Sequence, residues 1–199
     1  MKEVLEEFST LLKERLSKTY TTEDSVRYTF FAALLKRTNI APHEIIFEYP
    51  HPKIPGAEVD SYIPSSSERK GLVLEFKYDR QIPSGRNAPR PQKAGKLFND
   101  IYRLTQFHAD PNSTLWFVYL TDSEMASYLK NERNGLTDFF ELPLGAVLRV
   151  DKEYISSKSN TFQGAIGGFL SAKIKCVWNE KMPKQHEVRV YEILPLSIA

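Results

Sequence analysis

The sequence predicts an α/β protein in which helices flank a mixed central β-sheet, with a β-rich C-terminal extension. Apolar residues recur at helical spacing in three segments: residues 2–17, a segment that begins at Thr21 or Thr22, and residues 93–108. Between the second and third helices, three short runs have the composition of strands: 44–49, 58–63 and 72–78. A fourth run, 114–121, is apolar throughout, which is typical of a central strand buried on both faces.

The remaining third of the chain is expected to add strands to the same domain. Strand-like runs lie at 146–150, 172–177 and 187–194. No linker or shift in composition separates them from the preceding part. The chain has 199 residues, enough for one domain with a proper core. We therefore expect one domain over 1–199, with a core at about 20–135 and the β-rich extension at 136–199.

Composition excludes several classes of protein. The net charge of +2 identifies no nucleic-acid partner, so any basic surface must be local. The single cysteine, Cys176, excludes an internal disulfide and a cysteine zinc cluster. The first residues carry no apolar stretch, and the longest uncharged apolar run near them, 30–35, is too short to span a bilayer. These features lead us to expect an intracellular, cytoplasmic protein without a membrane segment.

The segment 56–78 combines strand patterning with charges. In its second strand, Glu75 and Lys77 are two residues apart, so their side chains share one face of the strand. Leu72, Leu74 and Phe76 occupy the other face and are expected to enter the core. Charged groups on a largely buried strand cost free energy unless they are paired or bind an ion. The pattern therefore indicates chemistry at this strand.

Asp60 supplies a third charged group. In the first strand Val59, Ser61 and Ile63 alternate with Glu58, Asp60 and Tyr62, so pairing of the two strands would bring Asp60 beside Glu75. Two carboxylates beside a lysine suit Mg²⁺, which takes oxygen ligands and keeps several waters. A similar Glu-x-Lys spacing, Glu68 to Lys70, lies in a serine-rich turn without apolar alternation, and we reject it as the site.

Together, Asp60 and Glu75-Phe76-Lys77 resemble the motif of the PD-(D/E)XK nucleases, which have a restriction-endonuclease-like fold. Val59 stands where the family name has proline. The resemblance covers roughly residues 20–120. It implies a Mg²⁺ site, with Mn²⁺ as a substitute, formed by Asp60, Glu75 and the Phe76 carbonyl. Lys77 would deprotonate or orient the attacking water, or offset charge that develops on the phosphate.

An acidic residue on the first core helix is also part of what the resemblance implies, and Glu23 is the candidate. It falls near the middle of the apolar stripe of its helix, from where it would reach toward Asp60 and Glu75. The alternative is structural, because acidic residues favour the first turn of any helix.

A local excess of positive charge follows the motif. Arg80, Arg86 and Arg90 lie in a proline-containing segment, 79–92, that we interpret as a long loop. Lys93 and Lys96 open the next helix, along a flank that also carries Asp100 and Arg103. Basic side chains here would contact nucleic-acid phosphates; the alternative is a solvated linker and an ordinary charged helix face. The resemblance also implies that a polar residue of this helix can serve the site, with Gln92, Lys93 and Lys96 as candidates.

The expected function is therefore metal-dependent hydrolysis of phosphodiester bonds, with DNA as the expected substrate and a homodimer left open. Two alternatives remain at this point. The chain could be a non-catalytic nucleic-acid-binding or assembly subunit that keeps the fold, or Asp60, Glu75 and Lys77 could form only a structural ion pair. The four histidines are scattered, which argues against a zinc site, and no phosphate-binding loop of the GxxxxGK type is present.

Overall fold

The computed structural model describes residues 1–82, 85 and 87–196. Within these residues the chain is an α/β protein with a mixed seven-stranded sheet and seven α-helices. The strands are β1 (Ile46–Pro50), β2 (Glu58–Ile63), β3 (Gly71–Asp79), β4 (Ser113–Thr121), β5 (Val147–Val150), β6 (Ala172–Met182) and β7 (His186–Pro195). The helices are α1 (Lys2–Lys18), α2 (Glu23–Arg37), α3 (Arg90–Thr105), α4 (Ser123–Lys130), α5 (Thr137–Phe140), α6 (Lys152–Ser156) and α7 (Asn160–Gln163).

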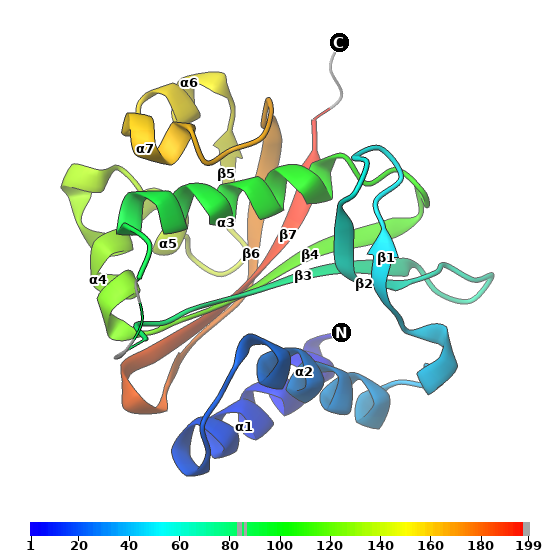
Figure 1. Ribbon diagram of the computed structural model, residues 1–199. Helices are drawn as coiled ribbons and strands as arrows, with labels where there is room; N and C mark the ends of the chain where they lie inside the picture. The colour runs from blue at the N-terminus through cyan, green and yellow to red at the C-terminus, as the bar shows by residue number, and fades with distance from the viewer. Residues whose placement is uncertain (83–84, 86, 197–199) are drawn as a thin grey trace.

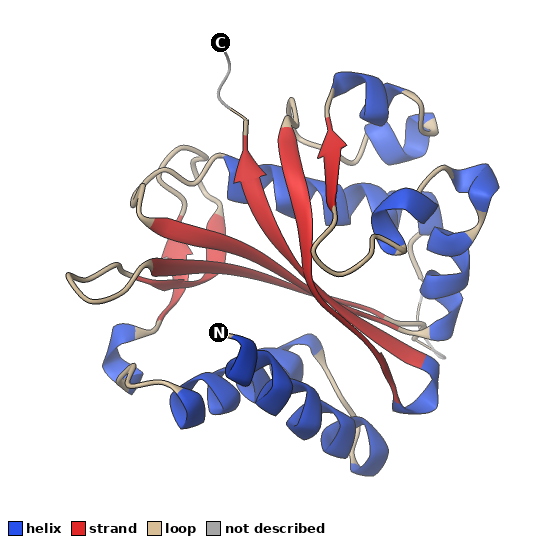
Figure 2. Ribbon diagram, turned by 180° about the vertical axis from the view of Figure 1, so that it is seen from behind, coloured by secondary structure: helices blue, strands red, loops and turns tan. Residues whose placement is uncertain are grey.

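The sheet separates two layers of helices. Figure 1 shows α1 and α2 together below the sheet and α3 above it, with α6 and α7 beyond α3. Each face has its own apolar core. One is formed with α1 and α2 around Phe8, Phe30 and Phe76, and the other with α3 around Phe98 and Tyr119. The view from behind in Figure 2 shows the strong twist of the sheet between its two ends.

The strand order is β1-β2-β3-β4-β7-β6-β5. β3 and β4 run parallel, and α3 forms the connection between them; the other neighbouring strands are antiparallel. The expected neighbourhood of the strands that carry Asp60 and Glu75 is confirmed, since β2 pairs with β3. The predicted strands of the C-terminal part join the same sheet, because β7 pairs with β4.

Two helix starts place residues of the candidate site. Thr22 caps α2, and its hydroxyl accepts a hydrogen bond from the Ser25 amide at 3.2 Å. α3 begins at Arg90, three residues earlier than predicted, so the loop before it is shorter than the sequence suggested. The sequence places the prolines in the loop, but Pro91 lies in the first turn of the helix, where its missing N–H costs nothing.

Other local expectations need correction. The segment beyond residue 136 contains the predicted strands, as β5, β6 and β7, but also the short helices α5, α6 and α7, which the sequence did not predict. The predicted strict alternation in β2 is broken, because Val59 and Tyr62 both pack in the core beside α3. Among the described residues, no helix is long and apolar enough to cross a membrane.

Candidate active site at the open edge of β3

The candidate site begins where β2 separates from β3. Pairing between the two strands ends at Ser61 opposite Leu74. Beyond this point carboxylates take the place of the partner strand: the Phe76 amide donates to Asp60 Oδ2 at 2.7 Å, and the Tyr78 amide donates to Glu23 Oε2 at 2.7 Å. The N–H and C=O of one strand residue point to the same edge, so the Phe76 carbonyl shares this edge with Asp60.

Glu75 and Lys77 face α3, as their spacing predicts. Glu75 Oε1 accepts from Arg103 Nη2 at 2.6 Å. Lys77 Nζ lies 3.9 Å from Asp100 Oδ2 and 3.8 Å from Glu23 Oε2. Lys77 therefore pairs with carboxylates from two helices, and the structural pair between Lys77 and Glu75 considered above is not among its ion pairs.

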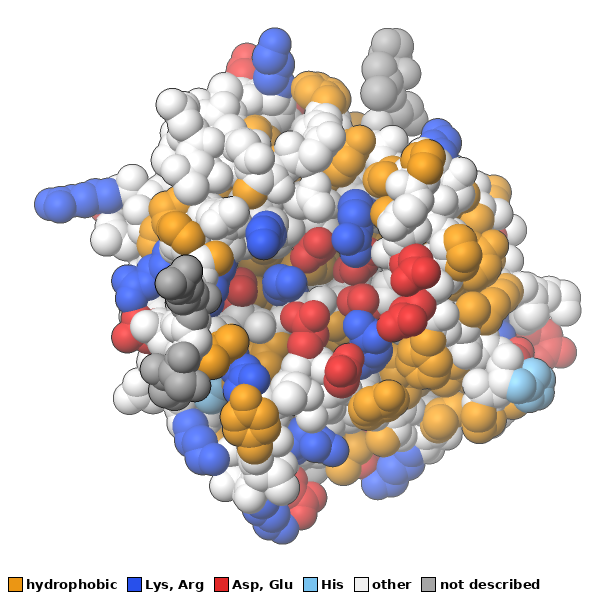
Figure 3. Space-filling view, viewed as in Figure 1, with side chains coloured by type: hydrophobic (Ala, Val, Ile, Leu, Met, Phe, Trp, Pro, Cys, Tyr) orange, Lys and Arg blue, Asp and Glu red, His pale blue; other side chains and the backbone are white. Residues whose placement is uncertain are grey.

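Asp60 also has a cationic partner. Arg27, one turn after Glu23 on α2, places Nη2 2.7 Å from Asp60 Oδ1. The open edge thus gathers carboxyl groups from β2, β3, α2 and α3 together with a few cations. We call this set the edge cluster: Glu23, Arg27, Asp60, Glu75, Lys77, Asp79, Asp100 and Arg103. In Figure 3, acidic and basic side chains gather in the middle of this face, between α3 and α2.

The edge cluster has five carboxyl groups against three cationic side chains, a formal excess of two negative charges. Two carboxyl pKa values in the cluster are raised, in each case mainly by burial. Burial raises the pKa of Glu75 well above its usual value, and the Asp60 charge adds to this shift while Arg103 opposes it. Burial likewise raises the pKa of Asp100 to about 6, against the influence of Lys77 and Arg103. A divalent cation would relieve the same excess of negative charge.

The pKa of Lys77 is also raised, but by neighbouring carboxylates and not by burial. Burial alone would lower it, but the carboxylates of Glu23, Asp100 and Asp79 outweigh burial and raise the pKa above its usual value. Lys77 is therefore a cation at neutral pH. In this arrangement its hydrogen bonds are donated, and it is poorly suited to remove a proton from water.

The donor chemistry of the site fits a hard divalent cation. Asp60, Glu75 and the Phe76 carbonyl offer oxygen atoms at one edge, and Mg²⁺ is often held by one or two carboxylates while it keeps several waters. Asp60 is partly exposed, whereas Glu75 is 2% exposed. Across residues 1–82, 85 and 87–196, no group of three or more His, Cys, Asp or Glu residues converges as a metal cage. The fit is thus to a site with two carboxylates, both of which carry an arginine partner here.

The residues expected to contact nucleic acid lie in different environments. The Arg80 guanidinium lies 4.4 Å from the centroid of the Tyr20 ring. Arg90 is exposed and pairs with Glu124. Lys93 donates to the Arg80 carbonyl at 3.1 Å, and Lys96 is exposed on α3.

Arg86 lies outside the described residues. Gln92 lies in the first turn of α3, and no described hydrogen bond joins it to the edge cluster. Lys93, which binds the Arg80 carbonyl, has no described ion pair with the cluster either.

Sequence reasoning missed four members of the edge cluster: Arg27, Asp79, Asp100 and Arg103. Asp100 and Arg103 are three residues apart on α3, and Arg103 Nη1 lies 3.8 Å from Asp100 Oδ1. Their place on the same helix flank as Lys93 and Lys96 was visible in the sequence. What singles them out is the position of that flank over β3, which only the packing of α3 determines.

A separate cavity of about 490 Å³ lies at the other end of β3, beside Gly71 and Leu72. It is lined by Ile40, Trp116 and others, and Glu68 is the one carboxylate in its lining. We take the edge cluster as the candidate functional site, because there, among the described residues, carboxylates from two helices lie within 4 Å of one lysine.

Comparisons with protein-family models, curated proteins and solved structures yield no match to this chain.

Proposed function

We propose that the chain is a metal-dependent nuclease that hydrolyses phosphodiester bonds, with DNA as the expected substrate. The observation that carries the proposal is the meeting of Asp60, Glu75 and Lys77 at the open edge of β3, from the neighbouring strands β2 and β3. The three residues occupy the positions of the PD-(D/E)XK motif. Asp60 comes from a different strand than Glu75 and Lys77, yet its charge raises the pKa of both groups, a proximity that a chance match to the motif would not require.

The order of elements supports a restriction-endonuclease-like core in residues 23–121. A helix, α2, precedes three antiparallel strands, β1 to β3, and α3 then leads to the parallel strand β4. This order brings α2 and α3 to the two sides of β3. Glu23 from α2 and Asp100 from α3 consequently both lie within 4 Å of the Lys77 ammonium, at 3.8 and 3.9 Å.

Asp60, Glu75 and the Phe76 carbonyl would hold the Mg²⁺ ion, and Mn²⁺ would substitute for it. When bound, such an ion lowers the pKa of a coordinated water and polarises a phosphoryl oxygen. In this structure Arg27 and Arg103 neutralise the two carboxylates. Metal binding therefore requires that both arginine side chains turn toward another anion. Each keeps a buried Nε–H without a partner among the described residues, which leaves donor capacity for phosphate oxygens.

Lys77 acts as a charged donor in this proposal. Its ammonium group orients the attacking water or stabilises the negative charge that develops on the phosphate. Glu23 stabilises the open edge of β3, because its carboxylate accepts a hydrogen bond from the Tyr78 amide. The same carboxylate lies 3.8 Å from the Lys77 ammonium group. Asp100 holds Lys77 from the opposite side, so the ammonium group is positioned between two helices.

One observation favours the alternative, a non-catalytic nucleic-acid-binding or assembly subunit with this fold. Glu75 is 2% exposed and forms an ion pair with Arg103, an arrangement that is complete without a metal. The two candidate functions differ in one outcome, which is whether the chain cleaves a phosphodiester bond when a divalent cation is added.

A cleavage assay distinguishes them. Labelled single-stranded and duplex DNA are incubated with the protein in Mg²⁺, Mn²⁺ or a chelator. We expect metal-dependent cleavage that falls at least about 100-fold in Asp60→Asn and in Glu75→Gln. Lys77→Met should lose most of the activity but still bind Mn²⁺ in a calorimetric titration, because an ammonium group is not a metal ligand.

The matched control is Glu68→Gln, which changes the exposed Glu-x-Lys sequence of the β2–β3 turn and should leave cleavage unchanged. Absence of cleavage by the folded wild-type protein in either metal, on either DNA form, would favour the non-catalytic subunit.

A further inference from the structure

An exposed aromatic ring lies next to the edge cluster. Tyr20 is 72% exposed, three residues before Glu23. The Arg80 guanidinium lies 4.4 Å from the centroid of the Tyr20 ring and 5.8 Å from that of Tyr78. Tyr78 is the residue whose amide donates to Glu23. Tyr20 and Arg80 therefore continue the edge of β3 on which the site lies.

The arrangement of the Tyr20 ring leaves one face available. A guanidinium that stacks on an aromatic ring covers one face of it. With Arg80 on one side and 72% of the residue exposed, the other face of the ring is open to solvent. Exposure of a large aromatic ring to water is unfavourable. A flat apolar ring beside a cation suits a flat ligand that carries negative charge.

Basic side chains lie near Tyr20, although Lys18 is paired with Glu14. Arg80 lies over the ring, and Lys18, at the end of α1, is exposed two residues before Tyr20. Lys93 is held close by through its hydrogen bond to the Arg80 carbonyl.

We propose that Tyr20 and Arg80 form a base-stacking platform for single-stranded nucleic acid that leads into the edge cluster. An unpaired base can lie flat on the open face of Tyr20 while its phosphate contacts nearby cations. A duplex cannot use this contact, because its bases are stacked on one another and only their edges are accessible. The inference rests on the proposed function and narrows its substrate to single strands, or to the unpaired ends and flaps of duplexes.

Equilibrium binding tests the platform separately from cleavage. Fluorescence anisotropy of a labelled 15-nucleotide oligothymidine and of a labelled duplex is measured in a chelator, so that no strand is cut. Wild type should bind the single strand more tightly than the duplex. Tyr20→Ala should weaken single-strand binding roughly 5- to 150-fold, the effect expected for loss of one stacked base. Tyr20→Phe should retain most of the affinity, and duplex binding should change little in either variant.

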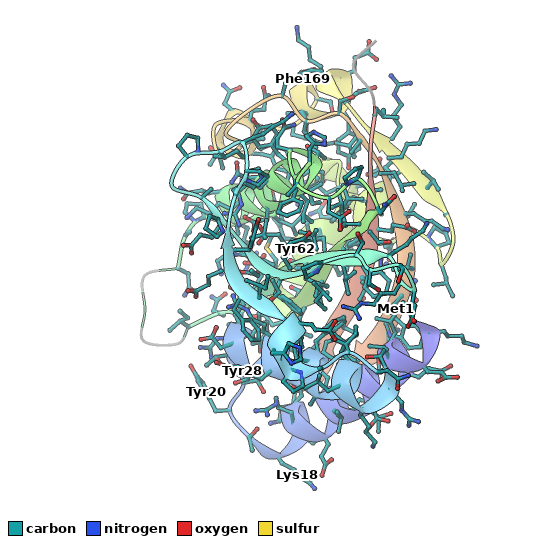
Figure 4. All side chains as sticks on the ribbon, turned by 90° about the vertical axis from the view of Figure 1, so that its right-hand side faces the viewer. Met1, Lys18, Tyr20, Tyr28, Tyr62 and Phe169 are labelled. Carbon is teal, nitrogen blue, oxygen red and sulfur yellow. The ribbon has the colours of Figure 1, made fainter. Side chains whose placement is uncertain are left out.

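Phe169→Ala is the matched control. Phe169 is also exposed, at 55%, and Figure 4 shows it at the opposite end of the molecule from Tyr20. Its replacement should leave both affinities unchanged.

Three results would overturn the platform: equal affinity of Tyr20→Ala and wild type for the single strand, an equal loss for the duplex, or an equal loss in Phe169→Ala. A change of oligomeric state in Tyr20→Ala by light scattering, with single-strand affinity intact, would also overturn it and assign the ring to a protein contact. None of these results bears on metal-dependent cleavage, which the assay above decides. Conversely, a Tyr20-dependent preference for single strands would stand even in a protein that cuts nothing.

Discussion

Replacement of Arg103 by methionine would remove the cation that neutralises Glu75. Arg103 Nη2 lies 2.6 Å from Glu75 Oε1, and Glu75 is 2% exposed. Methionine retains the length and apolar stem of the arginine, so the change mainly removes the guanidinium. Arg103→Met therefore leaves a carboxyl group in the protein interior with the negative charges of Asp60 and Asp100 nearby.

Loss of one partner of a buried ion pair costs about 3–5 kcal/mol, because the remaining charge is left without compensation. The Arg103 side chain is 27% exposed, so solvent screens part of the interaction and the lower end, about 3 kcal/mol, applies. For a chain of this size, that corresponds to a fall of roughly 6–12 °C in the melting temperature. In a Glu75→Gln background the same Arg103→Met change should cost under about 1 kcal/mol, because no charge is left unpaired.

The contribution of Glu75 to the free energy of unfolding depends on pH with a definite sign. The folded-state pKa of Glu75 is raised above its unfolded value, so stability from this group is fully present below the unfolded pKa, near 4.3, and is lost as pH rises through the folded pKa. Arg103→Met raises the folded-state pKa of Glu75 further. The stability lost through this substitution should therefore be largest at pH 7.5 and shrink toward pH 4. Urea unfolding at both pH values measures this, with the exposed pair Arg149–Asp151 as a control whose loss through Arg149→Met should have little effect. An equal cost at both pH values, or no rescue by Glu75→Gln, would refute the account of this pair.

Three further predictions concern the edge cluster and its surroundings. Burial raises the pKa of Asp79 to about 6, so Asp79→Asn should stabilise the protein at pH 8 by up to about 3 kcal/mol and not at pH 4, as urea unfolding would show. Thr22→Ala should lower stability by about 1 kcal/mol and reduce cleavage, since Thr22 caps the helix turn that holds Glu23, whereas Thr22→Ser should preserve both. In a salt series, Arg80→Ala and Lys96→Ala should each flatten the slope of log affinity for duplex DNA against log salt by up to about one unit. Arg90→Ala should have a smaller effect, because Arg90 already pairs with Glu124.

Local spacing was enough to predict the shared face of Glu75 and Lys77, because the side-chain period of a strand is fixed at two. A short polar turn was enough to predict that β2 and β3 are neighbours. The ion pairs could not be predicted in this way. Asp60 and Arg27 are 33 residues apart, and Glu75 and Arg103 are 28 residues apart, so these contacts depend on how α2 and α3 pack against the sheet.

The start of α3 shows a different limit of sequence reasoning. A proline in the first turn of a helix and a proline in a loop have the same local signature, and only the hydrogen bonds of the following turn distinguish them. The irregular packing of β2 between Val59 and Tyr62 likewise depends on contacts with α3 that alternation alone does not contain.

The central claim is that Asp60 and Glu75 hold one divalent cation, and a crystal soaked in Mn²⁺ tests it most directly. We predict one anomalous-difference peak at the open edge of β3, about 2.1 Å from a carboxylate oxygen of each residue. Arg27 and Arg103 should then have turned away from the two carboxylates. A fully soaked crystal in which both arginine pairs persist and no peak lies within reach of Asp60 and Glu75 would contradict the claim.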